Sequence, residues 1–200
     1  MRRRFYRGGC VVALLAAGLA LQACAPPFYC AKSVHGRVVD AETQQPLTAA
    51  VIVAEWVPMT VVFPDRTTPL HVAEDVTDAN GNYSIPGWGP RFRWPLTRLR
   101  DYDPELILFK SGYRPRFLFN HRDRNGFVRS SDWDSKTVPL HPFRGTPTER
   151  LAELKAILGK AAWDRRMPPM LCEEMLKERS LAGPSGKLFF DNLLDLRGSR

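Results

Sequence analysis

The chain has 200 residues, with 29 Lys and Arg against 21 Asp and Glu, and a formal net charge of +8 at pH 7. Four arginines lie in residues 1–23, so the rest of the chain carries 25 basic and 21 acidic residues, a net charge of only +4. This mixed charge gives no reason to expect a nucleic-acid partner, and the length suits one domain with a small appendage.

Residues 1–23 have the order of an export signal. Arg2, Arg3, Arg4 and Arg7 precede an apolar run, Val11–Ala20, which leads into Leu21-Gln22-Ala23-Cys24. The apolar run is shorter than the roughly 20 residues that a helix needs to span a bilayer. We therefore expect residues 1–23 to be a signal peptide that is removed. The basic start leaves both the general and the twin-arginine export routes open.

Leu21 to Cys24 resembles the bacterial lipobox, in which the cysteine is acylated and becomes the first residue of the mature protein. The resemblance implies a lipoprotein that carries palmitate-type chains on Cys24 and has the membrane as its partner, since two or more chains anchor a protein stably. Ala25 stands where an aspartate would resemble an inner-membrane retention signal. We therefore expect the periplasmic face of the outer membrane. The alternative is a cysteine that merely ends an ordinary signal.

Short apolar alternations follow a linker at residues 24–33. They predict strands at residues 34–39, 50–56, 72–77, 82–85, 106–109, 117–119 and 137–140. Polar turns separate them, and the Asn-Gly pairs at Asn80-Gly81 and Asn125-Gly126 are typical of tight hairpins. Many short strands without intervening helices predict a mainly β fold over residues 34–142, an antiparallel β-sandwich of the transthyretin-like or Ig-like type.

A helical pattern begins at Thr146. Thr146 and Glu149 fit a capping box with Pro147 at the first helical position. Leu151, Leu154, Leu158 and Ala161 then share one helical face. Shorter helices are predicted at 170–179 and 187–196, so residues 146–200 form a small C-terminal helical appendage. Its apolar face either packs on its own domain or is offered to a partner.

Several segments together resemble the carboxypeptidase regulatory-like domain, a transthyretin-like β-sandwich. They are Val34–Asp40, Pro46-Leu47, Thr77–Ile85 and Lys110–Tyr113. In this pattern Gly36 allows close packing over the first strand, and Tyr83 and Ile85 face the core. The resemblance implies a non-catalytic module with a structural or binding role, and no metallocarboxypeptidase domain follows it. We therefore expect that the chain is not an enzyme.

An alternative interpretation is a small hydrolase of the same fold, 5-hydroxyisourate hydrolase, whose C-terminus carries Tyr-Arg-Gly-Ser. This chain ends Leu196-Arg197-Gly198-Ser199-Arg200, and His35 lies on the first predicted strand. The tyrosine is absent, and predicted helices precede the tetrapeptide where the family has a strand. The interpretation therefore stays an alternative.

We expect no metal site, no cofactor and no catalytic residue. Asp78, Asn80 and Asn82 resemble the start of a calcium loop, but Tyr83 stands where that loop needs glycine and Gly89 where it needs an acid. The four histidines have no ligand spacing. The sequence contains no nucleophile elbow, phosphate loop or metalloprotease motif.

Residues 86–104 are predicted to form a long loop in which aromatic residues alternate with arginines. The candidate binding residues are Trp88, Arg91, Arg93, Trp94, Arg98 and Arg100. Indole and guanidinium groups bind sugars, phosphates and carboxylates, so the loop is a candidate site for an envelope polymer or an envelope protein. The alternative is that its aromatic rings fold back onto the edge of the sandwich.

Two cysteines, Cys30 and Cys172, follow the lipidated position. An even pair in an oxidising compartment favours a disulfide, which would tie the appendage to the start of the sandwich. The alternative is a buried thiol at Cys172 on the apolar face with Leu171 and Met175.

Overall fold

The computed structural model describes residues 28–60, 69–92, 97–121, 126–160, 167–180 and 186–198. The strands are β1 (Phe28–Ala31), β2 (Val34–Asp40), β3 (Val51–Trp56), β4 (Pro58–Thr60), β5 (His71–Val76), β6 (Asn82–Ile85), β7 (Trp88–Phe92), β8 (Thr97–Leu99), β9 (Glu105–Phe109), β10 (Arg116–Leu118), β11 (Val128–Arg129) and β12 (Lys136–Leu140). The helices are α2 (Pro147–Lys160), α3 (Pro169–Leu176), the 3-10 helix η1 (Lys177–Ser180) and α4 (Lys187–Gly198).

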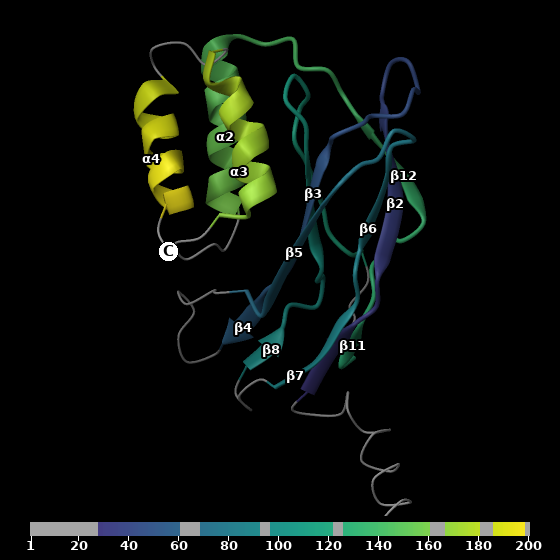
Figure 1. Cartoon of the computed structure of the whole chain (residues 1–200). Helices are drawn as coiled ribbons and strands as arrows, with labels where there is room; N and C mark the ends of the chain where they lie inside the picture. Colours follow the sequence, from purple (N-terminus) through teal and green to yellow (C-terminus); the bar gives the residue numbers. More distant parts are fainter. Residues whose placement is uncertain are drawn as a thin grey trace, which may run out of the picture.

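Two sheets form a β-sandwich, as the sequence predicted. One sheet has the strand order β12-β2-β6 and the other β10-β9-β3-β5. Neighbouring strands are antiparallel except that β12 runs parallel to β2, and β11 parallel to β1. Apolar side chains from both sheets meet between them, among them Val38, Ile85 and Val138 from one sheet and Ile52 and Leu106 from the other. Two smaller sheets, β11-β1-β7 and β4-β8, extend the sandwich at the end away from the helices (Figure 1).

The sheet that contains β3 and β9 is the middle of three layers, because α2, α3 and α4 cover its other face (Figure 1). Alternate residues of β3 therefore enter two different cores. Ile52 and Ala54 face the second sheet, whereas Val51 and Val53 face the helices. This double burial explains why β3 reads as a nearly continuous apolar run.

The helical layer begins at the predicted capping box. The backbone N–H of Thr146 donates to Glu149 Oε2 at 2.7 Å, and the N–H of Glu149 donates to Thr146 Oγ1 at 3.3 Å. Leu151, Leu154 and Ile157 of α2 are buried against the middle sheet, and Leu158 is partly buried. The predicted apolar face therefore packs on the same chain, with Ile157 as a member that the sequence pattern did not single out; Ala161 lies outside the described residues.

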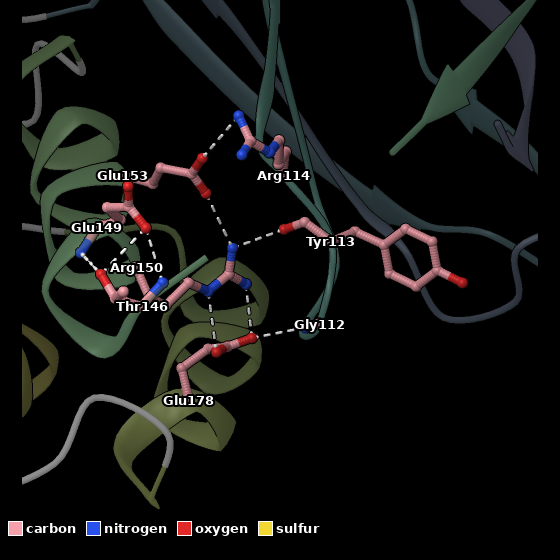
Figure 2. A network of polar contacts seen from close by, with 8 residues as sticks. All are labelled: Gly112, Tyr113, Arg114, Thr146, Glu149, Arg150, Glu153 and Glu178. Atoms are coloured by element: carbon pink, nitrogen blue, oxygen red, sulfur yellow. Dashed lines mark hydrogen bonds and ion pairs between the residues drawn. The ribbon is translucent and has the colours of Figure 1, made fainter. Parts of the chain in front are cut away.

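A buried ion pair ties this layer to the turn that follows β9 (Figure 2). Arg150 Nε donates to Glu178 Oε2 at 2.9 Å and Nη2 donates to Oε1 at 2.6 Å, and both side chains are almost fully buried. The turn supplies further partners: Arg150 Nη1 donates to the Tyr113 carbonyl oxygen at 2.7 Å, and the Gly112 N–H donates to Glu178 Oε1 at 2.7 Å. The helices are thus joined to the sandwich by directional polar contacts as well as by apolar burial.

Gly36 has the role that the sequence pattern predicted, whereas the turn at Asn80-Gly81 forms without the predicted hairpin, because β5 pairs with β3 in one sheet and β6 pairs with β2 in the other. Gly81 ends the turn before β6 with a φ of +77°, while Asp78 Oδ1 accepts the N–H groups of Asn80 and Asn82, each at 2.8 Å. The side chain of Tyr83 lies directly over Gly36, where a Cβ atom would be 2.5 Å from the tyrosine oxygen. Tyr83 and Ile85 are buried in the core, as predicted.

Five strands were not predicted from the sequence: β1, β4, β7, β8 and β11. β1 occupies residues assigned to the linker at 24–33, and β7 and β8 occupy parts of the predicted loop at 86–104. The physical reason is pairing: β7 is antiparallel to β1, and β8 is antiparallel to β4, which lies far away in the sequence. The turn predicted at Asp123–Gly126 lies mostly outside the described residues.

Candidate functional site

An open groove of about 650 Å³ crosses the outer face of β2 and β6 beside β5. Its lining residues include His35, Arg37, Asp75, Asp78, Ser84 and Lys136. The pairing of β2 with β6 positions these residues. His35 is paired with Ser84, and outward-facing residues of neighbouring strands lie side by side. The groove therefore offers both positive and negative groups to a polar ligand.

The carboxylates of the groove are held by backbone donors. Asp75 Oδ2 accepts the Ser84 N–H at 2.6 Å, which satisfies a donor on the outer edge of β6. Hydrogen bonds from the backbone N–H groups of Asn82 and Asn80 hold the pKa of Asp78 below its ordinary value. The cations are less constrained: Arg37 donates through Nε to the Asn80 carbonyl oxygen at 3.0 Å. The lining is thus suited to binding an anionic or hydrogen-bonding surface group through Arg37 and Lys136.

His35 has the carboxylate of Asp134 on one side and is paired across the strands with Ser84, which carries a hydroxyl. The Nδ1 of His35 is 3.6 Å from Asp134 Oδ1. A nucleophilic serine needs a hydrogen bond to its base and a sheltered oxyanion site. Within the described residues no hydrogen bond joins Ser84 Oγ to His35, and the imidazole is more than half exposed. Asp134, His35 and Ser84 therefore do not form a catalytic triad in this arrangement.

The predicted loop residues divide between two strands at the end away from the helices. Trp88 of β7 packs edge-to-face on Trp56 at 5.4 Å and lies 5.2 Å from the His71 ring. Arg91 lies 5.8 Å from the Trp88 ring and donates to the Leu70 carbonyl oxygen at 3.3 Å. Trp88 therefore folds back onto the sandwich, and burial, with the charge of Arg91, lowers the pKa of His71 to about 4.

The remaining arginines of the predicted loop are placed separately. Arg98 of β8 is exposed and pairs with Asp101 at 3.8 Å, and the guanidinium of Arg100 lies 5.8 Å from the Tyr102 ring. Arg93 and Trp94 lie outside the described residues. Among the members that the structure describes, Trp88 and Arg91 are in contact with each other, while Arg98 and Arg100 make their contacts elsewhere.

Buried ionisable residues lie beneath this end of the sandwich. Asp103 and Arg129 are almost fully buried, as are Glu55 and Glu105, which face each other across β3 and β9. Asp103 Oδ2 accepts the Val57 N–H at 2.9 Å, and Arg129 Nη2 donates to the Leu99 carbonyl oxygen at 3.0 Å. Burial raises the pKa of Asp103 to about 8, although Arg129 acts in the opposite direction. The sequence pattern did not predict this cluster, although two glutamates in otherwise apolar strands were a signal for it.

The predicted disulfide between Cys30 and Cys172 is wrong. Cys172 is a buried thiol on α3, in the apolar layer between the middle sheet and the helices, where its Sγ lies 3.8 Å from the Leu193 carbonyl oxygen. Cys30 is in β1, whose buried residues belong to the core between the two sheets and not to the helical layer. The buried thiol at Cys172 is the alternative that the sequence had left open. Cys24, the predicted lipidation site, lies outside the described residues.

In the described ranges, no group of three or more His, Cys, Asp or Glu side chains is arranged to hold a metal ion. None of the helices over those ranges combines the length and the apolar character needed to cross a membrane.

No protein-family model matches the sequence, and no curated protein matches it. Solved structures similar to the chain include 3-chlorocatechol 1,2-dioxygenase from Rhodococcus opacus, with 14% identity, a TM-score of 0.35 and coverage of 57% of this chain and 61% of that one. An alternative pilotin from the type II secretion system of Vibrio cholerae has 16% identity and a TM-score of 0.31, with 57% of this chain and 98% of that one covered. The chain thus spans only about three fifths of the dioxygenase. Likenesses of this size carry no argument for an activity or a partner.

The expectation that the chain is not an enzyme is corrected by these comparisons. Hydroxyquinol 1,2-dioxygenase from Pseudomonas putida is also among the similar structures, with 15% identity and a TM-score of 0.31. The enzymatic status of the chain is therefore not established, because one fold can host enzymes as well as binding modules.

Proposed function

We propose that the chain is a lipid-anchored cell-envelope protein whose β-sandwich, of the carboxypeptidase regulatory-like type, binds a partner close to the membrane. The observation that carries the proposal is the short separation between Cys24 and the fold. The lipobox-like Leu21-Gln22-Ala23-Cys24 is followed, four residues later, by Phe28, the first residue of β1. Lipid on Cys24 would therefore hold the sandwich against the membrane surface.

We further propose that the anchor lies in the outer membrane and that the sandwich faces the periplasm. Ala25 supports this location, because an aspartate there would resemble the inner-membrane retention signal. The change Ala25→Asp should move the protein from outer-membrane to inner-membrane fractions in a density gradient. Equal distribution of the natural protein and the Ala25→Asp variant would contradict the outer-membrane assignment.

The lipid anchor itself is tested by replacing Cys24 with Ser, which removes the sulfur that would carry the diacylglyceryl group. Cys24→Ser should leave the membrane fraction, because one or more acyl chains no longer supply the roughly 0.8 kcal/mol per buried methylene that retains the protein. Cys10→Ser, in the same signal segment, is the matched control and should stay with membranes. Retention of Cys24→Ser in salt-washed membranes would contradict the anchor.

The binding role rests on the groove over β2 and β6, since its cations are accessible and it belongs to the sheet that the helices leave uncovered. An envelope polymer with phosphate or carboxylate groups, or an envelope protein, would suit Arg37 and Lys136. A photo-crosslinking amino acid at position 136 should capture the partner in intact cells, whereas the same group at the exposed Lys155 of α2 should not. Equal capture from both positions, or capture from 155 alone, would contradict this role.

A further inference from the structure

Two large apolar side chains lie exposed on the outer face of the β11-β1-β7 sheet. The side chain of Phe28 is 37% exposed and that of Phe92 is 55% exposed, and their rings meet edge-to-face with centroids 5.7 Å apart. They are cross-strand partners in β1 and β7, so the ladder fixes them on one face. Val128 of β11, which is 47% exposed, pairs with Cys30 on the same small sheet.

The opposite face of this sheet already fills the core. Tyr29 and Ala31 of β1 are buried, and Arg129 of β11, the partner of Ala31, is buried with them. The exposed phenylalanines therefore contribute little to the interior of the sandwich. Exposed apolar residues gathered on one face, rather than scattered singly, are typical of an interaction surface.

The chain that precedes β1 places this surface beside the predicted lipid. Three residues separate Cys24 from Phe28. Four extended Cα–Cα steps reach at most about 14 Å, so the start of β1 cannot lie farther than this from the acylated cysteine. That distance is about twice the roughly 5–8 Å thickness of the headgroup region of one leaflet, so this end of the fold lies close to the bilayer.

Basic side chains also occur on or next to the strands of the two small sheets at this end of the fold. Lys32, which directly follows β1, Arg91, the neighbour of Phe92, and Arg98 of β8 are all exposed. Aromatic rings at the interface with nearby Lys and Arg side chains are the combination that binds a lipid surface, because the rings enter the headgroup boundary and the cations meet phosphates.

From these relationships we infer that the outer face of the β11-β1-β7 sheet, led by Phe28 and Phe92, rests on the phospholipid bilayer that holds the anchor. This inference depends on the proposed lipidation of Cys24. It gives the anchored protein a fixed orientation: the β1 end contacts lipid headgroups, and the helices, which lie beside the middle sheet and away from β7 and β11, are held off the membrane (Figure 1).

The orientation is tested with the full-length lipidated protein in vesicles of phosphatidylethanolamine with a minority of phosphatidylglycerol, doped with a phospholipid that carries a photoactivatable group near its headgroup. After illumination, peptides are mapped by mass spectrometry. Label should concentrate on peptides that contain residues 28–32 and 88–92. The Phe28→Ser/Phe92→Ser variant should lose this label several-fold. Leu188→Ser, which removes a 73% exposed apolar side chain from α4, is the matched control and should not change it.

The same sample separates the two proposals. An unmodified Cys24 peptide and recovery of the protein away from vesicles would reject the lipid anchor itself. A lipidated, vesicle-bound protein that is labelled equally on α4 and β7, or not labelled on β1 and β7, would keep the anchor and overturn the orientation. Protection of residues 88–92 by soluble envelope polysaccharide and not by vesicles would likewise overturn it, in favour of a polymer on this face.

Discussion

Arg150 and Glu178 form a doubly hydrogen-bonded ion pair, with Nε–Oε2 at 2.9 Å and Nη2–Oε1 at 2.6 Å, in the layer between the helices and the sandwich. Burial alone would raise the pKa of Glu178, but the hydrogen bonds from Arg150 and from the Gly112 N–H hold it below its ordinary value. The helical layer is therefore part of the folded sandwich and not a loosely attached tail.

Arg150→Met should lower the free energy of unfolding by about 3–5 kcal/mol, because it leaves the Glu178 carboxylate buried without its cation. Adding Glu178→Leu should recover part of that loss. Arg144→Met, which removes the exposed partner of Glu42, is the matched control and should cost no more than about 1 kcal/mol. Urea denaturation measures all of them, and equal effects for Arg150→Met and Arg144→Met would contradict the structural role of the buried pair.

Asp103 should make stability fall as the pH rises. Its carboxyl keeps its proton up to about pH 8 in the folded protein, whereas the ordinary value is 3.8. Between these values the folded state binds more protons than the unfolded chain, so the free energy of unfolding decreases with increasing pH. Asp103→Asn keeps an acceptor for the Val57 N–H but cannot ionise.

The free energy of unfolding of the Asp103→Asn variant should therefore change less with pH than that of the natural protein, when denaturation is measured from pH 5 to pH 8. Asp101→Asn, which alters the neighbouring carboxylate paired with Arg98, serves as the control. An Asp103→Asn protein with the same pH slope as the natural one would mean that this carboxyl does not hold its proton in the fold.

Gly36→Ala should destabilise the sandwich, since the added methyl group would meet the Tyr83 side chain at 2.5 Å. Overpacking of this kind costs about 1–3 kcal/mol. Gly159→Ala is a contrasting control, because nothing lies within 4 Å of the added carbon and alanine favours the helix by about 0.8–1 kcal/mol. The melting temperature should fall in Gly36→Ala and rise in Gly159→Ala. A rise in both variants would show that the Tyr83 side chain leaves room for a methyl group at residue 36.

Cys172 should be alkylated only after unfolding, and without any reductant. The thiol is fully buried and is not part of a disulfide. Mass spectrometry of the peptide that contains residue 172, before and after denaturation with iodoacetamide present, measures this. Labelling that appears only once a reductant is added would restore the disulfide interpretation.

The sequence predicted the parts of the fold that local chemistry determines. The apolar strands β2, β3 and β9, the turn at Asn80-Gly81 and the capping box at Thr146 all lie where expected, because each depends on nearby residues. β7 could not be recognised, since Gly89 and Pro90 interrupt it and its strand character comes from pairing with β1.

The polar residues that the structure brings together could not be predicted either, because their contacts join residues that are far apart in the sequence. Arg150 looks like an ordinary charged position on an exposed helix face, and its partner Glu178 is 28 residues later. Asp103 and Arg129 meet only when the ends of β8, β9 and β11 converge. The groove residues alternate with core residues along β2 and β6, so the pattern fixed their outward direction but not their neighbours.

Mass spectrometry of the N-terminal peptide of the protein extracted from cell membranes tests the lipid anchor most directly. We expect the mature chain to begin at Cys24, with a diacylglyceryl thioether on its sulfur that disappears together with membrane attachment in Cys24→Ser. A mature chain that begins elsewhere, or that begins at Cys24 with an unmodified sulfur, would contradict it.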